Sequence, residues 1–467
     1  MRRNYFNSFK PLSTPDGNLW VQVTNKGRTK VIPLMSEEAQ MLYKLYYREK
    51  EHKMISKKEL EDVFEEMQLD AFQNKIDHIL ESRIYTDDEG VYYNLNDGKG
   101  NVVAIEEGKV TIDKLEEVVF KTDKDAKEQE LPDLDIDVME LPKLVKKHFP
   151  LKSERDVILL SLYLASAFVG KRIAHPVILL NGSPGSGKSW TARLLQEIID
   201  PQNTNLHSVP QNRDDMAIRM NASYLVIWDN MRQLKKDFSD LLAQAVTGGV
   251  YTKRQLYSNT EEVKIQLRNL VILTGIDVVA TENDVLDRSI IIKLSRMESD
   301  KIIPENILKK QFEKDKSKFL GACFKLLGIA LNDKKKVTIP KTRLSENFIL
   351  MVKIGRALGY KDEETASIIW DNRSKANQIS LEDNVVAQCV ILLMGEVDSY
   401  CDSVGNLLLD LQEIAEQNPM YKVNLPTQPN VLSRKLNQAR TNLEEEYGIK
   451  YEIKNSGPNR KITIWKE

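Results

Sequence analysis

One glycine-rich segment has the residue types and spacing to bind phosphate. Eight consecutive residues match the pattern G-x-x-x-x-G-K-[ST]: Gly182, Ser183, Pro184, Gly185, Ser186, Gly187, Lys188 and Ser189. Backbone N–H groups of such a loop surround phosphate oxygens, and the next helix adds the positive end of its dipole. Lys188 is expected to reach the β- and γ-phosphates of ATP, and Ser189 to ligate Mg²⁺. Trp190 opens the helix predicted over 190–199 and completes the nucleotide-binding segment.

A carboxylate and its neighbour follow at the end of the apolar run YLVIWD. Asp229 is expected to hold Mg²⁺ directly or through water, because an acidic strand tip beside a phosphate loop does so in many ATPases. An aspartate that caps a helix is the alternative. Asn230 stands where many ATPases place a glutamate that orients the attacking water. We therefore expect either that another carboxylate activates the water or that ATP hydrolysis is slow.

Continuous apolar runs indicate the elements that position these side chains. The four runs cover residues 175–181, 224–229, 269–274 and 289–294 and alternate with helical patterns. Strands buried on both faces of a parallel sheet have this composition. The sequence therefore predicts an α/β fold with the phosphate loop at the end of its first strand.

The order of features after the loop resembles AAA+ helicases with a pre-sensor hairpin, which include the viral superfamily III and MCM helicases. The segments YLVIWDN, TGGVYTKRQLYSNTEEV, RNLVILTGID and LDRSIIIKL look closer to the replication-initiator helicases of staphylococcal pathogenicity islands and cassette chromosome elements. The resemblance runs from about Pro150 to the C-terminus. It implies an AAA+ P-loop αβα core with a helical lid, and assembly into a ring, expected to be a hexamer.

The resemblance also implies roles for three further residues. Thr274 falls at the sensor-1 position, where the wider group usually has Asn, and its hydroxyl can hydrogen-bond water or γ-phosphate. Arg288 matches the arginine finger that completes a neighbour's ATP site. Arg343 matches sensor 2. The alternatives are a surface arginine beside a strand for Arg288 and a solvated helix residue for Arg343.

Two basic segments are candidate DNA contacts. Alternating residues at 250–257 and 262–268 predict a hairpin, and in this helicase group the hairpin lines the pore. Its Lys253, Arg254 and Lys264 would bind phosphates of single-stranded DNA, unless they only solvate the hairpin.

The C-terminal region reads as helix, helix and hairpin, the order of a winged helix. From Val431 onward it holds eight basic and five acidic residues. The residues expected to contact duplex DNA at a replication origin are Arg434, Lys435, Arg440, Arg460 and Lys461. A winged helix that docks a protein is the alternative.

Composition sets the remaining expectations. The 467 residues carry a net charge of −2 and three cysteines, which favours local basic patches and a reducing cytoplasm. The longest apolar stretch is too short to cross a membrane. We expect an N-terminal α/β module over 1–120, an acidic linker over 121–140, the ATPase over 141–379 and the winged helix over 380–467. The stretch 121–140 has eight acidic residues against three lysines, and an exposed edge of a neighbouring domain is the alternative to a solvated linker.

Three functions are compatible with these features. The first is a ring-forming ATP-dependent DNA helicase that initiates replication of a mobile genetic element. The second is a non-processive DNA-binding loader or switch, which Asn230 and Thr274 make credible. The third is a nucleotide-gated scaffold, against which the basic hairpin and C-terminal region count.

Overall fold

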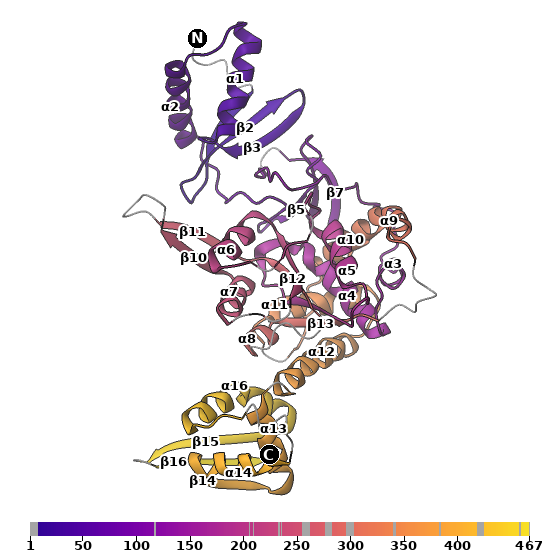
Figure 1. Ribbon diagram of the computed structural model, residues 1–467. Coiled ribbons are helices and arrows are strands. Elements are labelled where there is room, and N and C mark those ends of the chain that lie inside the picture. The colour runs from indigo at the N-terminus through magenta and orange to yellow at the C-terminus, as the bar shows by residue number, and fades with distance from the viewer. Residues whose placement is uncertain are drawn as a thin grey trace.

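The computed structural model describes residues 8–466 except 116–117, 205, 209, 232–233, 235, 255–261, 276–282, 296–302, 340–341, 383, 418–424 and 457–458. The chain is an α/β protein with a small N-terminal lobe, a central unit and a C-terminal unit, arranged in chain order (Figure 1). The central unit holds a parallel sheet among many helices, as the apolar runs predict. None of the described helices is long and apolar enough to cross a bilayer.

The N-terminal lobe combines an antiparallel sheet with two helices. Its elements are β1 (Phe9–Ser13), β2 (Leu19–Asn25), β3 (Arg28–Pro33), α1 (Glu37–Glu51) and α2 (Lys57–Gln73). The side chains of Ser36 and Ser56 cap the two helices. The helical pattern over 56–82 predicts a longer helix, but α2 ends before Asn74. The Asn74 carbonyl accepts from the Ser13 amide, and its side chain donates to the Pro11 carbonyl, so the chain turns onto β1.

The second N-terminal sheet belongs to the central unit rather than to this lobe. Its strands are β4 (Ile84–Thr86), β5 (Gly90–Asn94), β6 (Asn101–Glu106) and β7 (Lys109–Lys114), paired in that order. Ile84, Tyr93 and Val103 lie in the same hydrophobic core as the central sheet, whereas Phe9 and Phe64 lie in a separate core. Two structural parts therefore replace the single module expected over 1–120.

The acidic stretch 121–140 is docked on the central unit over much of its length, so the expectation of a solvated linker needs correction. Gln129 is 3% exposed, and its amide donates to the carbonyl oxygens of Glu197 and Ile198. Lys325 donates to the carbonyls of Leu134 and Ile136. Backbone groups, the Gln129 side-chain amide and the Asp125 carboxylate, which accepts from Thr204, bind the central unit, and composition alone does not reveal these contacts.

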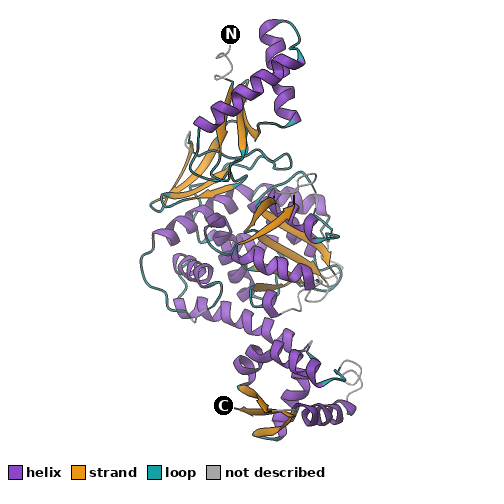
Figure 2. Cartoon of the chain, turned by 90° about the vertical axis from the view of Figure 1, so that its left-hand side faces the viewer, coloured by secondary structure: helices purple, strands orange, loops and turns teal. Residues whose placement is uncertain are grey.

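The central sheet has four parallel strands in the order β13-β8-β12-β9. They are β8 (Val177–Asn181), β9 (Leu225–Met231), β12 (Leu270–Gly275) and β13 (Ser289–Lys293). A parallel bridge between His207 and Trp228 extends the sheet beyond β9. All residues of β12 are buried, in keeping with a strand covered on both faces. Figure 2 shows the strands of the central unit among its helices.

Helices cover both faces of this sheet, with α5 across β8, β12 and β9, and α12 against β13. The helices of the unit are α3 (Glu140–His148), α4 (Glu154–Ser166), the 3₁₀ helix η1 (Ala167–Arg172), α5 (Lys188–Ile199), α6 (Arg213–Ala222), α7 (Lys236–Thr247), α8 (Asn283–Leu286), α9 (Glu305–Glu313), α10 (Lys316–Asn332), α11 (Ser345–Ala357) and α12 (Asp362–Glu382). The strands β10 (Gly249–Arg254) and β11 (Glu262–Leu267) form the expected hairpin immediately before β12.

The C-terminal unit packs two hairpin strands and a third strand against three helices. Its elements are α13 (Val385–Glu396), β14 (Ser399–Ser403), α14 (Val404–Glu416), α16 (Pro429–Tyr447), β15 (Ile449–Ser456) and β16 (Asn459–Lys466). β14 pairs with β16 and is not anticipated from the sequence. The sequence after Ser380 predicts a helix that starts near this serine, but α13 starts at Val385 instead. Asn384 caps it, and Ser380 lies inside α12, which runs between the two units (Figure 1).

Contact between the docked stretch and α10 can be tested at Gly321. A Cβ at this position would lie 1.8 Å from the Asp133 carbonyl oxygen. Gly321→Ala is expected to lower the free energy of unfolding by about 2 kcal/mol or more, because the backbone must shift. Gly395→Ala in α13 is the matched control, since nothing lies within 4 Å of its Cβ position. Urea denaturation should show that the control is neutral or slightly stabilising. Equal effects of the two substitutions would contradict the packing.

Candidate functional site

The phosphate-loop residues lie where β8 ends and α5 begins. Gly185 and Gly187 have φ of 79° and 80°, a conformation that glycine adopts without strain. A Cβ on Gly182 would lie 2.5 Å from Ser186 Oγ, so the loop folds closely on itself. The loop therefore has the compact backbone turn that surrounds a phosphate group.

Lys188 is the first residue of α5 and points back over the loop. Its Nζ donates to the carbonyl oxygens of Gly182 at 2.7 Å and Ser183 at 3.1 Å. The side chain is buried, and loss of hydration lowers the pKa of Lys188, partly opposed by the charge of Asp229. An ammonium group held only by carbonyl oxygens can transfer its hydrogen bonds to phosphate oxygens.

Three oxygen-bearing side chains meet where the strands β9 and β12 end and the helix α5 begins. Ser189 Oγ lies 3.1 Å from Asp229 Oδ1, and the Thr274 hydroxyl donates to the same carboxylate oxygen. The backbone N–H of Asn230 donates to Thr274 Oγ1 at 3.0 Å. Because parallel strands end at one sheet edge, β9 and β12 bring Asp229 and Thr274 to the loop that follows β8.

Asn230 and Thr274 differ in their access to a ligand. Asn230 is exposed and has φ of 58°, a left-handed conformation that is uncommon outside glycine but tolerated best by Asn and Asp. Thr274 is 0% exposed. Its hydroxyl donates to Asp229 and accepts from the backbone N–H of Asn230, so it orients the carboxylate in this conformation.

The donor set fits Mg²⁺ with a phosphate ligand. Mg²⁺ prefers hard oxygen ligands, and the Ser189 hydroxyl and Asp229 carboxylate provide them side by side. Ser186 Oγ is buried and has no hydrogen-bond partner in the described part of the chain. An orphaned hydroxyl inside the loop suits a site that gains a polar ligand.

The two candidate arginines lie at the opposite sheet edge. The Arg288 carbonyl accepts from the amide of Val177, the first residue of β8, at 2.8 Å. Arg288 is 8% exposed, and its guanidinium binds the Asp284 carboxylate at 2.5 Å. Arg343, which is exposed, pairs with the same carboxylate. The structure thus brings Arg288 and Arg343 together near the amino ends of the strands, whereas Lys188 follows the carboxyl end of β8.

The candidate DNA contacts occupy two further places. The backbone of Lys253, Arg254 and Lys264 lies in the hairpin strands, and their side chains are outside the described residues. In the C-terminal unit, Arg434 on α16 and Arg460 and Lys461 on β16 are exposed, and Lys435 is half-buried.

Arg440 makes an internal contact instead of projecting freely from α16. It donates to the Tyr451 carbonyl at 2.6 Å and stacks over the Tyr451 ring. In this conformation it joins α16 to β15, which the spacing of basic residues does not predict.

Two protein-family models match parts of this chain. Residues 148–361 match the model of the actinomycete integrative conjugative element replication protein, and residues 386–467 match the AICE RepA C-terminal domain. Together these ranges cover more than half of the 467 residues. The chain belongs to this family of replication proteins. The expected relationship to replication proteins of mobile genetic elements is therefore confirmed.

Solved structures show where the fold recurs. SCCmec type IV Cch, described as an active helicase, is 12% identical, with a TM-score of 0.54 over 98% of this chain and 93% of that chain. The NrS-1 C-terminal region is 11% identical, with a TM-score of 0.42 over 98% of this chain and 96% of that chain. At these identities the likeness to Cch concerns the fold alone. A comparison with curated protein sequences found no match.

Asp284 binds both candidate arginines, and it is not among the residues singled out from the sequence. The pKa of Asp284 lies below its ordinary value. Burial raises this pKa, but the guanidinium groups of Arg288 and Arg343 together lower it more. The spacing of Asp284 and Arg288, four residues apart, is the signal that could have found the first pair. The contact with Arg343 joins residues 59 positions apart and needs the fold.

The role of Thr274 in orienting Asp229 generates a prediction. Thr274→Val keeps the side-chain volume but leaves the backbone N–H of Asn230 without its acceptor. The free energy of unfolding should therefore fall by about 1–3 kcal/mol. Thr274→Ser retains the hydroxyl and should lose less. Urea denaturation of the three proteins measures the effect. Equal stability of the Val variant and the parent would show that the hydroxyl contacts do not form.

Proposed function

We propose that this replication protein is an ATP-dependent DNA helicase and replication initiator of a mobile genetic element. One observation carries the proposal: Ser189 and Thr274 both hydrogen-bond Asp229 at the sheet edge where Lys188 folds back over the glycine-rich loop. Phosphate loops with a serine and a strand-end carboxylate bind nucleoside triphosphates with Mg²⁺. Membership of a replication-protein family supports DNA as the substrate on which the energy of ATP hydrolysis acts.

Each residue at this edge has a task in the proposed ATP site. The loop amides and Lys188 bind the phosphates, and Ser189 and Asp229 hold Mg²⁺, which supplies charge neutralisation when bound. Thr274 fixes the Asp229 carboxylate. Asn230 reaches solvent beside it and can orient a water by hydrogen bonding without accepting its proton. Hydrolysis is therefore expected to be slow unless a second subunit or DNA improves the alignment of that water.

The central unit is proposed to be an AAA+ core with a helical lid that assembles into a ring. The strand order β13-β8-β12-β9, with the backbone at His207 beside β9, supports this assignment. Arg288 cannot reach its own chain's nucleotide because sheet polarity places it at the far edge. A second subunit would bring its Arg288 edge to the first subunit's phosphate loop, with Arg343 on the same face. Release from Asp284 is then part of the action of Arg288.

DNA is proposed to meet two parts of the chain. The hairpin β10–β11, with Lys253, Arg254 and Lys264, would bind single-stranded phosphates in the ring pore. The C-terminal unit is proposed to be a winged helix that binds origin duplex through Arg434 and Lys435 on α16 and through Arg460 and Lys461 on the wing β15–β16. Arg440 would contribute by holding the wing against α16.

A loader or ATP-dependent switch is the second candidate function. The specific observation in its favour is the exposed Asn230 beside Asp229, because an amide cannot serve as a general base. Strand displacement separates the two, since a switch binds DNA and ATP but does not unwind duplex.

The helicase proposal predicts ATP-dependent strand displacement by the full chain. Lys188→Ala should reduce ATP turnover and unwinding at least about 100-fold, because it removes a cation from the phosphates. Lys310→Ala, an exposed lysine of α9, is the matched control and should retain both activities. DNA-stimulated phosphate release without any strand displacement would instead support the switch.

Composite ATP sites predict complementation between two inactive variants. Lys188→Ala and Arg288→Ala proteins should each hydrolyse ATP poorly, since each disables every site in a uniform ring. An equimolar mixture should restore about one quarter of the sites, because an intact Lys188 then meets an intact Arg288 across a head-to-tail interface. Phosphate release before and after subunit mixing measures this. A mixture no more active than its components would contradict a site shared between subunits.

A further inference from the structure

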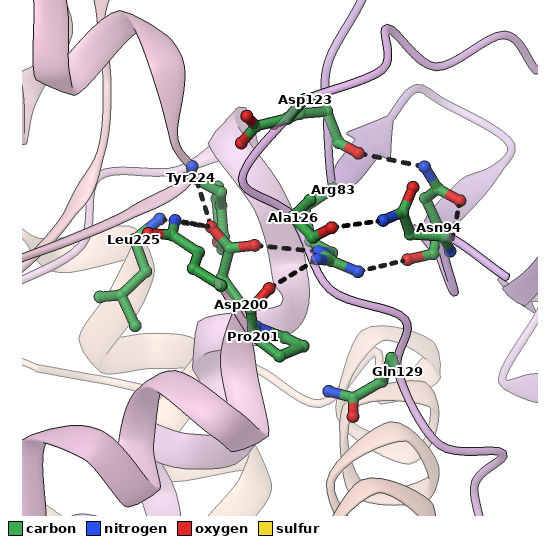
Figure 3. Close-up of polar contacts among 12 residues, drawn as sticks. Arg83, Asn94, Asp123, Ala126, Gln129, Asp200, Pro201, Tyr224 and Leu225 are labelled. Carbon is green, nitrogen blue, oxygen red and sulfur yellow. Dashed lines mark hydrogen bonds and ion pairs between the residues drawn. The ribbon is translucent and has the colours of Figure 1, made fainter. Parts of the chain in front are cut away.

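A buried arginine from the N-terminal half of the chain enters the central unit. Arg83 lies just before β4 and is 1% exposed (Figure 3). Its Nε donates to Asp200 Oδ1 at 2.9 Å. Its Nη groups donate to three backbone carbonyls, those of Asn94, Lys127 and Pro201, at 3.0–3.1 Å. The guanidinium therefore joins the β4–β7 sheet, the docked acidic stretch and the segment after α5.

The partner carboxylate connects the two elements that form the nucleotide site. Asp200 follows the last residue of α5, and its Oδ2 accepts from the backbone amides of Tyr224 and Leu225 at 3.2 and 3.1 Å. Leu225 is the first residue of β9. Figure 3 shows the carboxylate between these amides and Arg83. One side chain thus fixes the end of α5 to the start of β9.

The opposite ends of the same two elements carry the proposed Mg²⁺ ligands. α5 begins with Lys188 and Ser189, and β9 contains Asp229 near its end. A helix and a buried strand are stiff over these lengths, so their separation at Asp200 sets their separation at the 3.1 Å contact of Ser189 and Asp229. A change at Asp200 is therefore transmitted to the metal ligands.

Asp200 depends on Arg83 for charge compensation. The side chains of Arg83 and Asp200 are 1% and 4% exposed. A carboxylate buried to this extent is strongly destabilising when its partner cation is removed. The central unit consequently requires a cation from the N-terminal half to keep α5 and β9 in place.

We infer that Arg83 is a positioning residue for the nucleotide site, acting through Asp200 on the spacing of Ser189 and Asp229. The inference rests on the proposed ATP site and gives the β4–β7 sheet a role in it. The sheet then acts as a fixed part of the ATPase, and the separate lobe of β1–β3, α1 and α2 remains available for other contacts.

A double-mutant cycle on the full chain tests this inference. The proteins are Arg83→Met, Asp200→Asn and the double variant, and the readouts are thermal unfolding and Mg²⁺-dependent binding of a fluorescent ATP analogue. Arg83→Met should lower the unfolding midpoint by about 10 °C and raise the half-saturating Mg²⁺ concentration about tenfold. The double variant should recover the part of both losses that the unpaired charge causes, because no buried charge remains and Asn can still accept from β9.

Arg172→Met provides the matched control. Arg172 also binds across the β4–β5 turn, through the Asp87 carbonyl and the Asp88 carboxylate, but it touches neither α5 nor β9. It should leave Mg²⁺-dependent binding unchanged. Additive losses in the double variant would overturn the inference, as would an Arg83→Met protein that is less stable but has parental Mg²⁺ dependence.

The readouts keep this test separate from the proposed helicase. If the parent protein binds the ATP analogue with Mg²⁺ but unwinds no DNA, the helicase proposal fails while the cycle still decides the role of Arg83. A parent that binds no nucleotide at any Mg²⁺ concentration overturns both, and its thermal cycle then reports only a structural ion pair.

Discussion

The polarity of the parallel sheet is the constraint on which the arrangement of this protein depends. Parallel strands place all their carboxyl ends at one edge, which gathers the phosphate loop, Asp229 and Thr274. The same polarity sends Arg288, which precedes β13, to the other edge beside Val177. One chain therefore holds the two halves of the proposed ATP site facing apart. In the proposed composite site, a second copy would bring the two halves together.

Several ion pairs lie at the sheet edge that carries Arg288. Asp284 binds Arg288 and Arg343, and Arg373 on α12 lies 3.8 Å from Asp287. These ion pairs hold the three guanidinium groups in place on this face. α12 continues from this face toward the C-terminal unit, where Ser374 Oγ donates to Glu446 of α16. A short chain of contacts thus joins the face that carries Arg288 to α16, the proposed DNA-binding helix.

Local patterns in the sequence predict the parts of the fold that depend on near neighbours. The four apolar runs become the four strands of the central sheet, and the hairpin before β12 forms where alternation predicts it. The phosphate loop is recognised because its residues are contiguous. The family comparison confirms a replication protein of a mobile element, while the roles of the individual site residues stay predictions.

Features that depend on contacts between residues far apart in the chain cannot be predicted from local sequence patterns. α2 stops at Gln73 because Asn74 pairs with β1, more than 60 residues earlier. The stretch 121–140 looks solvated by charge, yet its backbone and Gln129 bind the central unit. Arg83 and Asp200 meet across 117 positions, and no motif marks either residue. Burial of a charge is decided by its partner, and the partner is visible only in three dimensions.

The most direct test of the account is electron microscopy of the full chain with a non-hydrolysable ATP analogue, Mg²⁺ and forked DNA. The account predicts a closed ring in which Arg288 of one subunit faces the nucleotide held by Lys188 of the next, with single-stranded DNA passing the β10–β11 hairpins. A monomer that binds nucleotide and DNA, or a ring whose Arg288 edges point away from every phosphate loop, would contradict it.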